Sequence, residues 1–213
     1  MGAQLSTLIP DAWSKAQFRR FWGNGGALSE VYFVMDSYEG VALRNRFRFE
    51  EARLGRPQLD TLAGNTVVDG AFSPQAAAML ADQFSRHAPD VLRVVSDAHP
   101  GLGPEATLIS YGTSDSNCKT FDIEAQSGSS LCRFLQDKTG RRAFRLAEQT
   151  FTMESRDGVM YDRAIVLRLT NREDANSCHV VCAGLSEWGS LSAVHYLTTH
   201  WKGLHRRFDR FGP

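Results

Sequence analysis

The chain has 213 residues, which is enough for one domain with a substantial hydrophobic core. Its 24 basic and 24 acidic side chains cancel to a formal net charge of zero, so no overall field favours nucleic acid, and we expect no specific nucleic-acid partner. The four cysteines show no disulfide framework, no apolar run reaches the length of a membrane span, and we find no signal peptide, which together favour a cytoplasmic protein.

Residues 1–29 are predicted to form an N-terminal helix and a hinge that precede a single domain over residues 30–213. Gly2 and Ser6 fit the loose pattern for N-myristoylation, and the helix after Pro10 carries aromatic and basic side chains. The commoner explanation for such a helix is that its aromatic side chains pack on the domain, so we expect no membrane attachment. The glycine-rich run at 23–26 is predicted to end the helix and form the hinge.

The first strand of the domain is predicted at residues 31–35, a short apolar run that delivers Asp36 to its carboxyl end. Residues 41–49 alternate between apolar side chains and arginine, which predicts a half-buried strand, with a helix as the alternative. Those arginines could bind phosphate, but a charged, solvated strand face is the commoner explanation. Residues 54–71 hold several glycines and no sustained period, which indicates a loop.

A helix is predicted to begin with Ser73 as N-cap and Pro74 as first helical residue, and to end near His87. Two strands follow, at 91–95 and 106–111. The second strand runs into a polar turn led by Gly112, after which either a helix or an extended segment is possible. Next come short segments that indicate an inserted β-hairpin or meander and then a strand, at residues 131–135, 142–146, 149–153 and 162–169.

The run from His179 to Ala183 has small and β-branched side chains without alternation, which is typical of a strand covered on both faces. Gly184 ends this strand, Ser190 is the predicted N-cap of the following amphipathic helix, and Gly203 is its predicted end. A strand that enters a helix through a glycine loop leaves unpaired amides at the positive end of the helix dipole. The loop is therefore a candidate anion site.

If the strands before Gly112 and Gly184 are parallel neighbours, their two turns face each other across a crevice at the carboxyl edge of the sheet. Open α/β sheets bind ligands at this edge. The structural alternative is that the polar side chains only bond loop amides. The candidate ligand-binding residues follow the first strand or lie on the two turns: Asp36, Gly112, Thr113, Ser114, Ser116, Asn117, Gly184, Ser186, Gly189 and Ser190.

Several motifs with known chemistry are incomplete in this chain. Residues 184–190 match the spacing of a phosphate loop, but the lysine is missing and Glu187 lies inside the loop, which argues against nucleoside triphosphate hydrolysis. The dinucleotide fingerprint is absent, so we expect no nicotinamide cofactor. The turn at Gly112 lacks the closing glycine of a serine hydrolase elbow, which weakens Ser114 as a nucleophile.

No pair of cysteine and histidine residues has the spacing of a metal site, so we expect none. Strand alternation places Cys178 and Cys182 on one face and His179 on the other, and buried thiols are the default for these cysteines. Carboxylates at the predicted ligand edge are the remaining catalytic candidates, above all Glu187 and Asp115. An acidic group near a ribose can hold hydroxyls or stabilise an oxocarbenium ion, as N-glycosidic cleavage requires.

The stretches ISYGTSDSN and VVCAGLSEWGSLSAVHYL resemble an uncharacterised bacterial family of Rossmann-like domains, over roughly residues 30–204. The resemblance implies a three-layer α/β fold and no established activity. The layout is more distantly similar to the TIR and nucleoside deoxyribosyltransferase groups, an analogy at the level of fold. The matching positions are Gly112, Ser116, Asn117, Ala183, Gly184, Gly189, Ser190, Ala193, Tyr196 and Leu197.

The sequence therefore predicts a three-layer, Rossmann-like α/β domain whose mostly parallel sheet carries an inserted β-hairpin or meander. The first hypothesis for its function is a sensor or regulatory domain that binds a small anionic, nucleotide-like ligand. The second is a nucleotide or NAD N-glycosidase that uses Glu187 or Asp115. The third is a protein or membrane interaction module without a ligand.

Overall fold

The computed structural model describes residues 5–23, 28, 30–37, 72–103, 105–127, 132–136, 141–170, 174 and 176–208. The strand predicted at 41–49, the loop predicted at 54–71 and the hinge after Gly23 lie outside these residues. So does the myristoylation pattern at Gly2.

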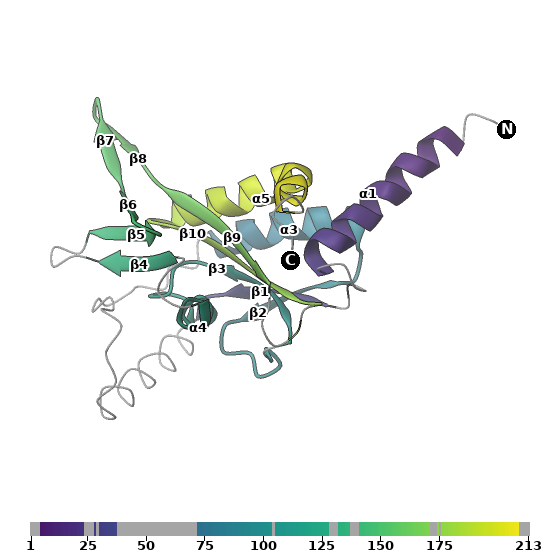
Figure 1. The fold of residues 1–213 in the computed structure, drawn as a ribbon, viewed down its shortest axis with the longest axis horizontal. Helices are drawn as coiled ribbons and strands as arrows, with labels where there is room; N and C mark the ends of the chain where they lie inside the picture. The colour runs from purple at the N-terminus through teal and green to yellow at the C-terminus, as the bar shows by residue number, and fades with distance from the viewer. Residues whose placement is uncertain are drawn as a thin grey trace.

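A five-stranded, mostly parallel sheet forms the centre of a mixed α/β fold (Figure 1). Its first four strands run parallel and only the last is antiparallel, so the predicted sheet type is confirmed. In spatial order the strands are β2 (Leu92–Ser96), β1 (Val31–Met35), β3 (Thr107–Tyr111), β10 (Cys178–Gly184) and β9 (Ala164–Thr170).

Three of the four helices in the described residues cover one face of this sheet. They are α1 (Leu5–Gly23), α3 (Ser73–His87) and α5 (Glu187–Phe208). Alternate strand residues such as Phe33, Ile109 and Val180 point to this face because side chains alternate along a strand. The terminal helix does pack aromatic side chains on the domain, as predicted, since Phe18 and Trp22 are fully buried.

The other face is covered by α4 (Cys118–Ser127) and by a three-stranded antiparallel sheet. In Figure 1, α4 lies below the central sheet and the small sheet lies to its left. A second core cluster joins these elements to β10, with Ile123, Phe134 and Val181 among its members. The small sheet is the predicted inserted meander. The segment after the Gly112 turn, for which a helix and an extended segment were both possible, is the helix α4. Its strands are β4 (Cys132–Gln136), β5 (Arg142–Leu146) and β6 (Gln149–Thr152).

A further hairpin, β7 (Glu154–Arg156) and β8 (Val159–Tyr161), projects from the body of the molecule (Figure 1). The sequence predicts no strand between residues 153 and 162, so both strands of this hairpin were missed. The turn itself is only Asp157-Gly158, and both residues have positive φ, at 52° and 77°. An Asp-Gly pair with this backbone joins two strands that share the usual right-handed twist, which leaves residues 154–156 free to form a strand.

Both predicted ends of the last helix were also wrong. The helix α5 begins at Glu187, three residues before Ser190, and it continues through Gly203 to Phe208. A glycine inside a helix costs about 1 kcal/mol relative to alanine. The last turns recover this by burying Leu204 and His205 in the core, a tertiary gain that the local sequence does not reveal. None of the described helices is long and apolar enough to cross a membrane.

Candidate functional site

The two polar turns singled out in the sequence lie side by side at the carboxyl edge of the sheet. The strands β3 and β10 are parallel neighbours, and the amide of Gly112 donates a hydrogen bond to the carbonyl of Cys182 at 3.0 Å. Gly112 has a φ of +98°, and a Cβ there would lie 2.7 Å from Ser116 Oγ, so the turn requires glycine. The predicted juxtaposition of the two turns is confirmed.

The strand order changes direction between β1 and β3. From β1 the chain reaches β2 on one side, whereas β3 leads to β10 on the other side. The connection after β1 contains α3 on one face of the sheet, and the turn after β3 leads into α4 on the opposite face. Open α/β sheets bind ligands at such a point. Asp36 directly follows β1 and therefore lies there.

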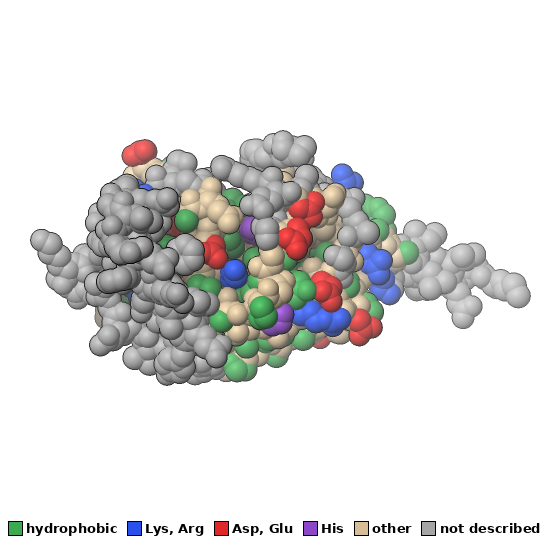
Figure 2. Space-filling view, turned by 90° about the horizontal axis from the view of Figure 1, so that it is seen from below, with side chains coloured by type: hydrophobic (Ala, Val, Ile, Leu, Met, Phe, Trp, Pro, Cys, Tyr) green, Lys and Arg blue, Asp and Glu red, His purple; other side chains and the backbone are tan. Residues whose placement is uncertain are grey.

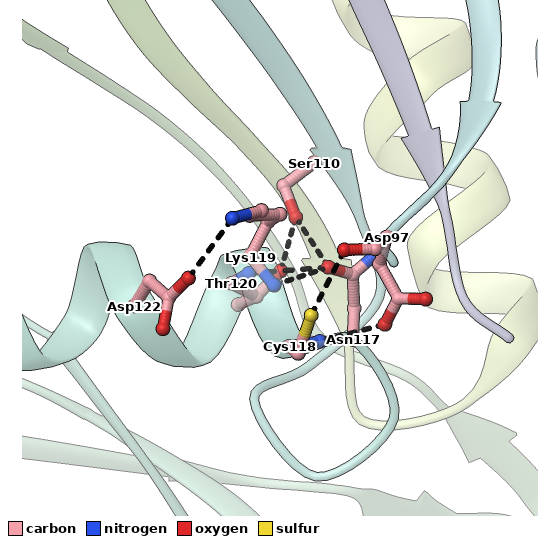
Figure 3. A network of polar contacts seen from close by, with 7 residues as sticks. All are labelled: Asp97, Ser110, Asn117, Cys118, Lys119, Thr120 and Asp122. Atoms are coloured by element: carbon pink, nitrogen blue, oxygen red, sulfur yellow. Dashed lines mark hydrogen bonds and ion pairs between the residues drawn. The ribbon is translucent and has the colours of Figure 1, made fainter. Parts of the chain in front are cut away.

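Asn117 acts as the structural anchor of the Gly112 turn. Its side-chain amide donates hydrogen bonds to the carbonyls of Val34 and Tyr111, both at 3.0 Å. Its Oδ1 accepts from the backbone amides of Lys119 and Thr120, at 2.9 Å and 3.2 Å, which caps the start of α4. The side chain of this predicted ligand-binding residue is therefore engaged within the protein (Figure 3).

Asp97, which the sequence analysis did not select, lies in the same network (Figure 3). It is 1% exposed, and its carboxylate accepts hydrogen bonds from the Cys118 amide at 2.8 Å and from Ser37 Oγ at 2.5 Å. A carboxylate at the first turn of α4 is favoured by the helix dipole. The available signal was its position directly after β2, the same signal that selected Asp36.

Asp115, a predicted catalytic residue, is 2% exposed and has a protein partner on each oxygen. Its Oδ2 lies 3.0 Å from Arg142 Nη2 on β5, and its Oδ1 accepts from the hydroxyl of Thr113. The neighbouring Ser114 hydrogen-bonds Glu124 on α4, and Ser116 Oγ donates to the Thr113 carbonyl at 3.2 Å. These contacts join the turn to the small antiparallel sheet and to α4.

The loop from Gly184 to Ser190 is closed by its own hydrogen bonds. The Gly184 amide donates to Ser190 Oγ at 3.0 Å, and this hydroxyl donates in turn to the Ser186 carbonyl at 3.2 Å. A Cβ on Gly184 would lie 2.3 Å from the carbonyl carbon of Gly189, so the glycines permit a direct backbone contact. The amide of Leu185 donates to a backbone carbonyl of the connection before β9.

Asp162 stands at the start of α5, where the sequence analysis placed an anion. It accepts a hydrogen bond from Ser186 Oγ, and its Oδ2 would lie 2.5 Å from a Cβ on Gly189. The helix α4 carries a carboxylate of the chain, Asp97, at its own start. The chain thus places an acidic group of its own at both helix N-termini, which satisfies the positive ends of the two dipoles.

Two groups with perturbed or unsatisfied chemistry, Asp36 and Tyr111, lie beside these turns. Burial raises the pKa of Asp36 to about 6, against the lowering effects of a backbone hydrogen bond and of Ser73, whose hydroxyl donates to Asp36 at 3.3 Å. Tyr111 is 4% exposed, and its hydroxyl has no hydrogen-bond partner among the described residues. Burial raises the tyrosine pKa, and the charges of Glu187 and Asp36 raise it further.

Glu187, the other predicted catalytic residue, is the first residue of α5 and is half-buried. Its charge and that of Asp36 both act on Tyr111. Tyr111 points to the face of the sheet that carries α3 and α5. Ser73 at the start of α3 bonds Asp36, and Glu187 is the first residue of α5. Sequence reasoning missed Tyr111. The usable signal was its place as the last residue of β3, since strand alternation directs it to the same face as Ile109.

The described residues contain no group of three or more histidine, cysteine or acidic side chains that could hold a metal ion. Cys178 and Cys182 pack in the same core cluster, on the opposite face of β10 from Val181, so the predicted alternation of the strand is confirmed. Burial raises the pKa of the Cys178 thiol to about 11, which makes it an inert core residue near neutral pH.

Comparison of the chain with protein-family models, curated proteins and solved structures finds no match. The resemblance to a Rossmann-like bacterial family therefore stays a prediction, and the case for function depends on the site itself.

Proposed function

We propose that the carboxyl edge around β1, β3 and β10 binds a small nucleotide-like ligand and that the protein acts as a sensor or regulatory domain. The observation that carries the proposal is the hydrogen bond from the Gly112 amide to the Cys182 carbonyl, because it brings the two polar turns together beside Asp36. The change of strand direction at this place supports the same location.

The charges at the edge favour the sugar of such a ligand over its phosphate. Asp97 and Asp162 already occupy the starts of α4 and α5, where a phosphate would otherwise bind. Carboxylates accept hydrogen bonds from hydroxyl groups. We therefore assign the hydroxyls of the ligand to Asp36 and Glu187, with any anionic group directed away from the edge.

The face that carries α4 gives no support to a nucleic-acid partner. Figure 2 shows acidic and basic side chains close to one another on that side rather than a field of one sign. One such pair is Lys119 Nζ and Asp122 Oδ2, 3.3 Å apart. A nucleic-acid surface would need clustered positive charge.

Native mass spectrometry of the protein as purified is the first test, because a copurified ligand would identify the chemistry directly. Thermal shift with nucleosides, nucleotides and NAD is the second. We expect Asp36→Asn and Glu187→Gln to reduce the ligand-induced shift, and Glu148→Gln, on an exposed turn, to leave it unchanged. If no nucleotide shifts the melting temperature, the proposal fails, and an interaction module without a ligand becomes the better hypothesis.

N-glycosidic hydrolysis is the second candidate function, and one observation favours it. With a pKa of about 6, Asp36 can hold a proton near neutral pH and can therefore act as a general acid. With a nucleoside or nucleotide as substrate, Asp36 would then protonate the departing base as its bond to the sugar breaks, whereas the nicotinamide of NAD leaves as a neutral ring and takes no proton. Glu187 would stabilise the oxocarbenium ion, which water converts to the free sugar with release of a proton.

Product analysis after incubation with NAD and nucleotides separates binding from hydrolysis. If the second candidate holds, we expect turnover to be lost in Glu187→Gln. Turnover of nucleotides should also fall as the pH rises through about 6, because Asp36 then loses the proton that the leaving base needs. Bound nucleotide that is recovered intact would leave the sensor function in place. The role predicted for Asp115 fits less well, since both of its oxygens already have partners.

We also propose the finer description of the fold as a three-layer, Rossmann-like domain. Helices on both faces of a mostly parallel sheet support it. A cytoplasmic location is supported by the four cysteines, which are buried free thiols.

A further inference from the structure

An exposed tryptophan stands at the candidate site. Trp188 is the second residue of α5 and is 65% exposed, whereas Trp22 and Trp201 are almost fully buried in the core. Its indole contacts the ring of Phe72, with centroids 4.4 Å apart and planes inclined at 52°. Exposing so large an apolar side chain forgoes the stabilisation that its burial would bring, and exposed aromatic residues recur at binding sites.

The two rings belong to segments that also carry the polar groups of the site. Phe72 immediately precedes Ser73, whose hydroxyl donates to Asp36. Trp188 immediately follows Glu187, which acts electrostatically on Tyr111. The starts of α3 and α5 therefore bring an aromatic wall and two carboxylates to one place at the edge of the sheet.

A second observation at this place also points to a ligand. The hydroxyl of Tyr111 is buried and has no hydrogen-bond partner among the described residues. A buried hydroxyl without a partner costs free energy, and such groups persist where a ligand or water completes them. The site thus combines a flat apolar surface, two acceptors of hydrogen bonds and one unsatisfied hydroxyl.

We propose that Trp188 and Phe72 stack on the planar heteroaromatic ring of the ligand, while Asp36, Glu187 and Tyr111 bind the hydroxyls of the attached sugar. The ligand class is then a nucleoside or nucleotide rather than a sugar phosphate. This inference rests on the proposed function and deepens it, because it names the part of the ligand that supplies affinity. Stacking tolerates different bases, so the wall by itself selects the class and not one base.

Isothermal titration of the full chain tests the assignment. The probes are adenosine, guanosine, cytidine and uridine, their 5′-monophosphates and NAD. Ribose 5-phosphate is the comparator that lacks the heteroaromatic ring. We expect Trp188→Ala to raise the Kd of the nucleosides and nucleotides that bind by between about five-fold and about 150-fold, the range that loss of one stacking contact produces. Binding of ribose 5-phosphate should stay unchanged, and Trp188→Phe should keep part of the affinity.

Trp13→Ala is the matched control, since Trp13 is 66% exposed but lies on α1, whose end packs at the amino end of β10. Its Kd values should equal those of the wild type. Because both tryptophans are exposed, both variants should keep the wild-type melting temperature, which excludes misfolding as the cause of any loss.

The outcomes separate the inference from the function beneath it. If a probe binds with the same Kd in the wild type and Trp188→Ala, and that binding is weakened by Asp36→Asn, the stacking wall is refuted and the proposed function stands. If none of the probes binds the wild type, both are refuted.

Discussion

Replacing Asp36 by asparagine is expected to stabilise the protein at neutral and higher pH. The substitution keeps the size of the side chain and the oxygen that accepts from Ser73 Oγ, but it removes the charge. In the folded state the pKa of Asp36 is about 6, raised from 3.8 mainly by burial. Ionisation is therefore harder in the folded protein than in the unfolded chain, and the ionised carboxylate destabilises the fold.

The sign and the pH window follow from this raised pKa. The stability contribution of Asp36 is fully present below pH 3.8 and is lost as the pH rises through about 6. A difference of about two pKa units corresponds to at most about 3 kcal/mol, and partial exposure of the side chain reduces this to about 1–2 kcal/mol. Up to about half of the loss falls between pH 5 and pH 8.

Urea denaturation of the wild type and Asp36→Asn at pH 5 and pH 8 measures the effect. The quantity to compare is the difference in unfolding free energy between the two proteins at each pH. This difference cancels other titrating groups such as His179, whose pKa is lowered by burial and whose contribution therefore falls as the pH decreases.

We expect the variant to exceed the wild type in unfolding free energy by about 1–2 kcal/mol at pH 8 and by less at pH 5. The exposed control Glu148→Gln should show no such pH dependence. A variant that is no more stable than the wild type at pH 8, or an advantage that grows towards low pH, would refute the reasoning. A higher unfolding free energy in Asp36→Asn would also fit a carboxylate that is retained for function although it lowers stability.

Three other predictions concern stability and are checked by urea denaturation. Gly112→Ala should lower the free energy of unfolding by about 1–2 kcal/mol, because its φ is +98° and Ser116 Oγ is close. Gly203→Ala should raise it by up to about 1 kcal/mol, because Gly203 lies inside α5 with open space around it. Equal effects of the two substitutions would contradict the assigned backbone roles. Asn117→Asp keeps the acceptor that caps α4 but loses two donated hydrogen bonds, so a loss of about 1–3 kcal/mol is expected, and an unchanged midpoint would argue against the anchor role. Arg142→Ala leaves the buried carboxylate of Asp115 without its cation and should lower the free energy of unfolding by about 1–3 kcal/mol, less than for a fully buried pair because Arg142 is partly exposed. Adding Asp115→Asn should recover part of this loss, and no recovery would show that the ion pair is not its cause.

The position of the candidate site was predictable because strand runs and their following turns are local features. The β10 segment has small and β-branched side chains without alternation, and burial on both faces follows from that composition. Asp36 and Gly112 were placed at strand ends by the same reading. Since parallel neighbouring strands end at one edge, their proximity followed once the sheet was taken to be parallel.

The chemistry of the individual side chains was much less predictable. Asn117 has the same turn position in the sequence whether it binds a ligand or caps a helix, and only its contacts with Val34 and the start of α4 distinguish the two. The sequence predicts Asp115 as a catalytic acid, and only the structure shows that Arg142 on β5 pairs with it. Val34 and Arg142 lie far from the turn in the sequence, so local patterns do not connect them to it.

The sequence by itself determined the strands of the central sheet and the polar turns at their carboxyl ends, because hydrophobic period and glycine placement act over a few residues. The tertiary structure alone decided the start of α5, where Asp162 binds Ser186 from 24 positions away, and the raised pKa of Asp36. Desolvation and hydrogen bonding depend on which distant groups surround an atom, and those neighbours exist only once the chain has folded.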